Sequence, residues 1–148
     1  MDIRHPPTPD LAPPAPPTPS MVVDGITLAP ASRLLHLASI RDRHRARARG
    51  ANDQSHDLLD RLNDCRRRAA LIMGRIDGQP GRHPQAEAEL AAIRAEEEQL
   101  QAARAAVQAE ASEASEAAGE AGRLLKSACR FVVQQGGSLP ATIAGEAR

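Results

Sequence analysis

The densest group of functional side chains in the sequence is a basic stretch, RDRHRARAR, at residues 41–49. Guanidinium groups at this density could neutralise several phosphates and give salt-dependent binding to a polyanion without sequence preference. The structural interpretation is a solvated helix face opposed by glutamates elsewhere in the chain. We favour that interpretation, because the net charge is zero and a single Phe, with no Trp or Tyr, offers little for stacking on single-stranded bases. The candidate polyanion contacts are Arg41, Arg43, Arg45, Arg47 and Arg49.

A second group has the residue types of a metal site. His56, Asp60 and Asp64 are four residues apart and would share one face of a helix. Three ligands on an exposed helix lack a fourth ligand and a closed pocket. The same surface carries two ordinary i,i+4 ion-pair spacings, Asp57 to Arg61 and Asp64 to Arg68. We therefore expect no metal.

The two cysteines, Cys65 and Cys129, make neither a disulfide framework nor a metal quartet. We expect each to be a small buried apolar residue, because no His and Asp accompany either of them in a triad-like setting. The sequence also lacks a Walker loop, a Gly-rich dinucleotide turn and an HExxH motif. The expectation is a protein that is not an enzyme and has no cofactor.

Residues 1–30 are expected to be a disordered, proline-rich tail followed by a lead-in. The first 20 residues hold eight of the twelve prolines and no periodic apolar pattern. Asp24-Gly25 between short apolar runs is a hairpin signal, but arms this short do not stand alone. The segment therefore either adds to another surface or is an irregular lead-in, and we favour the lead-in. PxxP spacing within the tail leaves an adaptor role open.

The rest of the chain predicts an all-α fold, a long antiparallel helical hairpin resembling a coiled coil. Apolar residues recur at steps of three and four along arms at about 32–77 and 85–135. Prolines and glycines in DGQPGRHP place a turn at 77–84. A break of the first arm near Gly50-Asn52 is left open, Gly136-Gly137 ends the second arm, and 136–148 is expected to be a flexible tail.

The turn also predicts a register, in which opposed residues have numbers adding up to roughly 162. Leu34 and Leu37 then come level with Ala128 and Leu125. Arg66, Arg67 and Arg68 come beside Glu96, Glu97 and Glu98, and the basic stretch falls opposite Glu113, Glu116 and Glu120. The predicted hairpin interface comprises Leu58, Leu62, Ala69, Ile72, Ile76, Leu90, Ile93, Leu100 and Val107.

The middle of the hairpin is expected to be weak. Residues 41–54 on the first arm, and those between Val107 and Leu124 on the second, include no large apolar side chain. Two helices also bury their large apolar side chains only partly. The transfer free energy that this burial supplies is small compared with the entropic cost of ordering nearly a hundred residues. We therefore expect the hairpin to self-associate or to pack on another protein.

These features favour a non-enzymatic structural or assembly protein that acts by helix-mediated oligomerisation or partner binding. The architecture is common among scaffold and virion-associated proteins, which is an analogy of architecture alone. The alternative is a nucleic-acid-associated accessory protein using Arg41–Arg49. The first 20 residues do not have the pattern of a secretory signal, and no apolar run reaches the ~20 residues of a spanning helix. We expect a protein that is not Sec-exported or in a membrane, located in the cytoplasm or in an assembled particle.

Overall fold

The computed structural model describes residues 22–23, 26–27 and 31–148. Two short strands, β1 (Val22–Val23) and β2 (Ile26–Thr27), pair antiparallel. The irregular lead-in that we favoured is therefore wrong for these four residues, whose pairing agrees with the hairpin signal of the sequence. The expected disordered tail at residues 1–20 lies outside the described residues.

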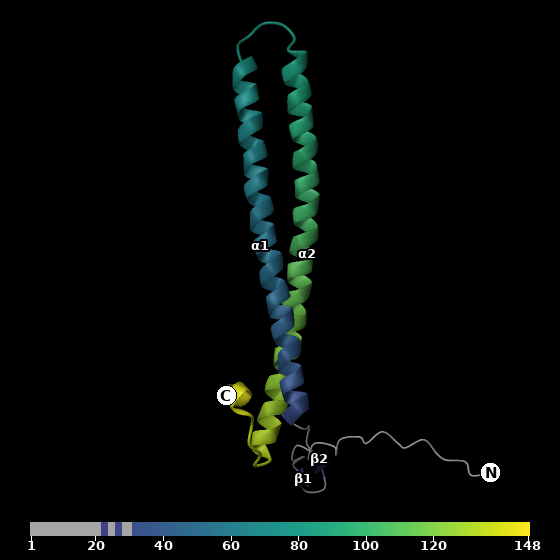
Figure 1. The fold of residues 1–148 in the computed structure, drawn as a ribbon, viewed down its shortest axis with the longest axis vertical. Helices are drawn as coiled ribbons and strands as arrows, with labels where there is room; N and C mark the ends of the chain where they lie inside the picture. Colours follow the sequence, from purple (N-terminus) through teal and green to yellow (C-terminus); the bar gives the residue numbers. More distant parts are fainter. Residues whose placement is uncertain (1–21, 24–25, 28–30) are drawn as a thin grey trace, which may run out of the picture. The chain divides into compact units, whose positions relative to one another are not determined.

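Two helices, α1 (Ala31–Ile76) and α2 (Pro84–Gln134), make up most of the described chain and run antiparallel (Figure 1). A 3₁₀ helix, η1 (Ala141–Ala147), follows them. The chain divides into two compact units. The turn unit is Arg41–Glu120, and the terminal unit comprises the described residues up to Ile40 together with Ala121–Arg148. The predicted all-α helical hairpin is confirmed.

The helix α1 passes through Gly50 without a break. Glycine in a helix costs roughly 1 kcal/mol relative to alanine, but the adjacent Ala51 is buried in the apolar cluster that α1 forms with α2, which keeps the segment packed. Of the two alternatives for the first arm, the structure therefore has the single helix.

A buried seam runs along each helix. Its positions alternate in steps of three and four, which is the 3.5-residue period of a coiled coil. All seam residues are buried or partly buried. In α1 they are Leu34, Leu37, Arg41, His44, Ala48, Ala51, Ser55, Leu58, Leu62, Cys65, Ala69, Ile72 and Ile76. In α2 they are Ala86, Leu90, Ile93, Glu97, Leu100, Arg104, Val107, Ala111, Ala114, Ala118, Ala121, Leu125, Ala128 and Val132.

The nine residues predicted for the hairpin interface all lie on this seam. Six are buried and three, Ala69, Ile76 and Leu90, are partly buried. The buried six are Leu58, Leu62, Ile72, Ile93, Leu100 and Val107. The seam thus brings large apolar side chains of α1 and α2 together in the part of the turn unit nearest the turn.

Interhelical ion pairs agree with the predicted register. Arg66 pairs with Glu97 at 3.4 Å and Arg68 with Glu96 at 3.0 Å, which are two of the expected neighbourhoods. The residue numbers of these pairs add up to 163 and 164, close to the expected value. In the terminal unit, Leu34, Leu37, Leu125 and Ala128 share one apolar cluster.

The seam of the turn unit changes from large to small side chains away from the turn. Ala111, Ala114 and Ala118 occupy it on α2, and Ala48 and Ala51 on α1. Alanine allows helices to approach closely but contributes little transfer or dispersion energy. The weak middle inferred from the sequence is therefore a continuous but apolar-poor stretch of the seam.

Glycine and proline set the ends of the helices. Gly78, at φ 73°, follows the end of α1, and Pro84 is the first residue of α2, where its missing N–H is not needed. At the end of α2 the N–H of Gly137 donates to the carbonyl of Val132, and that of Gly136 to the carbonyl of Val133. With Gly136 at φ 80°, these two bonds form a Schellman motif, which confirms the predicted stop.

The C-terminal segment corrects our expectation of a flexible tail at 136–148. The helix η1 places Ile143 in the cluster formed by the terminal unit, where only 2% of it is exposed. Ala38 and Cys129 are buried in the same cluster although they lie just outside the seam. We expected a free segment because Pro140 and Gly145 indicate irregular backbone. Burial of Ile143, with partial burial of Leu139, instead offsets the entropic cost of ordering the segment.

Candidate interaction surface

A charged flank runs along one side of the seam in the turn unit. Its arginines come from α1 and its glutamates from α2, and each of them directly precedes a seam residue. The three interhelical pairs of the flank are Arg47–Glu110 at 3.0 Å, Arg68–Glu96 at 3.0 Å and Arg75–Glu89 at 3.4 Å. This arrangement places positive charge along one edge of the flank and negative charge along the other. Exposed pairs of this kind fix orientation more than they stabilise the fold.

Arg68 is the most connected residue of the charged flank. Its Nη2 donates to Glu96 and also lies 3.2 Å from Cys65 Sγ, while its Nε donates to Asp64 in the same helix at 3.1 Å. The hydrogen bond to Glu96, followed by the charges around it, raises the pKa of Arg68 above its ordinary value. The guanidinium therefore stays charged at any pH at which the fold is studied.

An apolar groove lies within the charged flank, between the pairs Arg68–Glu96 and Arg75–Glu89. We call it the Leu71 groove, because Leu71 borders it and is 70% exposed. Its volume is about 380 Å³. Burying this leucine and the adjoining apolar groove against another protein surface would be favourable, because it would remove apolar area from water. The groove is lined by Arg68, Leu71, Ile72, Arg75, Glu89, Ala92 and Ile93.

The sequence did not single out Leu71. It lies one residue before the seam residue Ile72 but outside the steps of three and four, so the apolar stripe omits it. A search for large apolar residues that lie outside the apolar stripe would have identified Leu71. The terminal unit has exposed apolar side chains of its own, at Leu35, Leu124, Phe131 and Val133.

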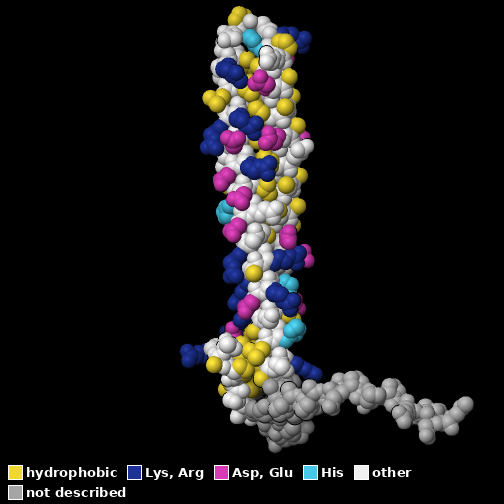
Figure 2. Space-filling model, in the orientation of Figure 1, with side chains coloured by type: hydrophobic (Ala, Val, Ile, Leu, Met, Phe, Trp, Pro, Cys, Tyr) yellow, Lys and Arg dark blue, Asp and Glu magenta, His cyan; other side chains and the backbone are white. Residues whose placement is uncertain are grey.

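The five arginines of the basic stretch do not form one cationic face. Arg41 is a seam residue, 8% exposed, and its Nε donates to Asp42 at 3.1 Å. At about 100° per residue, Arg43 and Arg47 lie on one side of α1 and Arg45 and Arg49 on the other. Figure 2 likewise shows Lys/Arg and Asp/Glu side chains interspersed along the described helices.

The expected acidic partners of the basic stretch need correction. Arg47 pairs with Glu110 rather than with Glu113, Glu116 or Glu120. Glu110 is closer to the turn than the three expected glutamates, and the long side chain of Arg47 spans this difference. Both residues directly precede seam residues, so they lie on the same flank. Arg45 lies 4.0 Å from Asp42 in its own helix. Part of the charge of the basic stretch is therefore neutralised within the chain.

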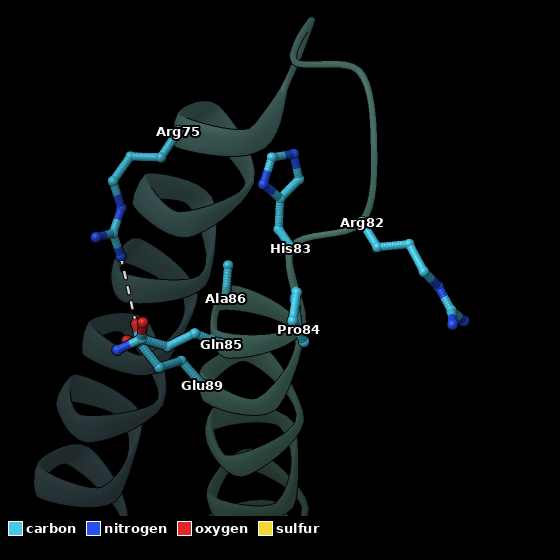
Figure 3. A pocket seen from close by; sticks show the side chains of 7 residues that line it. All are labelled: Arg75, Arg82, His83, Pro84, Gln85, Ala86 and Glu89. Atoms are coloured by element: carbon cyan, nitrogen blue, oxygen red, sulfur yellow. Dashed lines mark hydrogen bonds and ion pairs between the residues drawn. The ribbon is translucent and has the colours of Figure 1, made fainter.

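A second pocket, of about 460 Å³, lies at the turn beside the first residues of α2. Figure 3 shows that Arg75 reaches Glu89 while Arg82 extends away from the helices. His83 lies 3.5 Å from the carbonyl oxygen of Gln79. The cationic side chains of this pocket thus do not converge on a common point where an anion would sit.

The remaining candidate residues are placed as follows. His56, Asp60 and Asp64 are all exposed, and Asp64 pairs with Arg68 at 3.1 Å. No group of three or more His, Cys, Asp or Glu side chains in the described part of the chain is arranged to hold a metal ion. Cys65 and Cys129 are both fully buried, with 0% exposure, as predicted.

No helix among the described residues combines the length and the apolar character that crossing a membrane requires. Comparison with known proteins gives no match to a family model, to a curated protein or to a solved structure.

Proposed function

We propose that this protein is a non-enzymatic assembly protein, which acts by associating through the outer surfaces of its helical hairpin. The observation that carries the proposal is the Leu71 groove. It combines a leucine that is 70% exposed with an apolar groove inside an ordered charged flank. Apolar surface flanked by polar groups is the usual composition of a protein interface.

The composition of the seam supports the same proposal. Its middle is built from Ala111, Ala114 and Ala118, so much of the hairpin contributes little apolar burial. A two-helix structure of this kind gains stability when a second surface covers its outer faces. Association would thus be coupled to the stability of the hairpin.

Concentration-dependent unfolding tests this coupling. We expect the Tm, followed by circular dichroism at 222 nm, to rise with protein concentration, because association stabilises the folded state by mass action. A Tm that is independent of concentration over a hundredfold range would contradict the proposed coupling.

Replacing arginines separates assembly from binding of nucleic acid. The variant carries Arg43→Gln, Arg45→Gln, Arg47→Gln and Arg49→Gln, and it is compared with the parent for helicity, oligomer mass and DNA affinity against salt. The assembly proposal expects no measurable DNA binding by the parent. Salt-dependent DNA binding by the parent that the variant loses while keeping its helicity and mass would favour the nucleic-acid function instead.

A further inference from the structure

We infer that the Leu71 groove is the docking site for the Leu71 groove of a second copy of this chain, in a two-fold dimer with both turns at the same end. This inference rests on the proposed assembly function and specifies its partner. It draws on three features of the turn unit: the exposed leucine, the small residue opposite it and the separation of charge across the flank.

The two sides of the groove are complementary in size. Leu71 projects from α1, whereas the α2 side of the groove carries Ala92. When a two-fold axis runs parallel to the helices, α1 of each copy faces α2 of the other. Leu71 of one copy then packs over Ala92 of the second copy, and the same contact occurs twice, as an isologous interface requires.

The charges are complementary in the same arrangement. Arg68 and Arg75 line the α1 edge of the groove and Glu89 lines the α2 edge. Glu96 of α2 pairs with Arg68 at 3.0 Å. With the axis parallel to the helices, the arginines of each copy face the glutamates of the other. An axis perpendicular to the helices within the interface would oppose arginine to arginine, and like charges across an interface are unfavourable. Charge therefore selects the dimer with both turns at one end.

Substituting Leu71 tests the apolar contact. Leu71→Gln removes the apolar side chain while keeping a residue that suits helices, and Leu35→Gln is the matched control at an exposed leucine in the terminal unit. Because Leu71 contributes twice, we expect the dimer Kd of Leu71→Gln to rise at least about tenfold and that of Leu35→Gln to stay within about twofold of the parent. Equal dissociation constants for both variants and the parent would overturn the inference.

Two charge-reversed variants test whether the charges beside the Leu71 groove face each other across the interface. The first carries Arg68→Glu and Arg75→Glu, so the four charged residues beside the groove are all acidic, and the second carries Glu89→Arg and Glu96→Arg, so the same four residues are all basic. We expect each variant alone to be monomeric and a one-to-one mixture to form a heterodimer. Homodimers as strong as those of the parent, or a mixture that stays monomeric while both variants are helical, would overturn the inference.

The combined variant controls for loss of the internal ion pairs. With all four substitutions, both the internal pairs and the pairs between copies are restored with reversed sign. We expect it to dimerise like the parent even if the separate variants lose helicity, and a monomeric combined variant with parental helicity would overturn the inference.

The outcomes also separate this inference from the proposed function. If the parent associates but none of these substitutions changes its Kd, assembly stands and the Leu71 groove is not its surface. If the parent does not associate with itself and captures a different protein through Leu71, a second copy is the wrong partner.

Discussion

Ile143 of η1 and Cys129 of α2 lie in one apolar cluster and are 2% and 0% exposed. Cys129 directly follows the seam residue Ala128. Every other residue of α2 that directly follows a seam residue is exposed or partly exposed. Its burial, and that of Ala38, coincides with the cluster that Ile143 joins. The C-terminal segment thus closes the terminal unit over a side of the helices that the seam leaves open.

Removing the Ile143 side chain should loosen this closure. Ile143→Ala should lower the free energy of unfolding by about 2–5 kcal/mol, because it leaves a cavity in an apolar cluster. Urea unfolding measures the change, and Thr142→Ala, at an exposed neighbour, is the control. The thiol of Cys129 should also react faster with a disulfide reagent, whereas that of Cys65 in the turn unit should keep its rate. Unchanged stability and thiol reactivity would show that η1 does not cover Cys129.

Two adjacent leucines of α2 provide a test of the seam in the terminal unit. Leu125 is fully buried on the seam, whereas Leu124 is 56% exposed. We expect Leu125→Ala to cost about 2–5 kcal/mol of unfolding free energy, and Leu124→Ala about 1 kcal/mol or less. Chemical denaturation at one protein concentration compares them, and equal costs would mean that the seam is placed wrongly.

The alanine part of the seam should not tolerate a large side chain. Ala114 is fully buried, so Ala114→Leu should cost about 1–3 kcal/mol by overpacking. Ala109→Leu, on an exposed position of the same helix, should be nearly neutral. Thermal unfolding of both variants gives the comparison. Greater stability of Ala114→Leu would indicate that the helices are not closely packed at this level.

Two glycines should respond in opposite directions to alanine. Gly50 is helical and exposed, and a Cβ there would meet no heavy atom within 4 Å. Gly50→Ala should therefore raise the unfolding free energy by about 0.5–1 kcal/mol. Gly136→Ala should lower it, because the left-handed backbone at φ 80° disfavours a side chain. Urea unfolding decides both signs, and a stabilised Gly136→Ala would argue against the Schellman motif.

The sequence predicts the hairpin because its large apolar residues and its turn are unambiguous. Leu62, Ile72, Ile93 and Leu100 recur at helical spacing, and this pattern suffices to define two faces and their register. Hydrophobic period alone does not reveal the seam where it passes through polar residues. Arg41 and Glu97 occupy seam positions whose burial depends on the opposing helix, so the continuous period becomes visible only in the structure.

The C-terminal segment and the Leu71 groove are unpredictable for a related reason. Pro140 and Gly145 indicate irregular backbone, and only contact with residues distant in sequence makes Ile143 a buried anchor. Leu71 sits beside an apolar stripe in the sequence, and its exposure depends on which neighbouring residues face α2. Local propensity contains neither of these tertiary contacts.

The central claim is that the hairpin associates through its outer surface. Sedimentation equilibrium of the full chain, from about 1 to 100 µM, tests it most directly. The account predicts a weight-average mass that rises from near the 15.7 kDa of the monomer toward twice that value, with a transition that Leu71→Gln shifts to higher concentration. A mass that stays at that of the monomer across the whole range, with full helicity, would contradict the account.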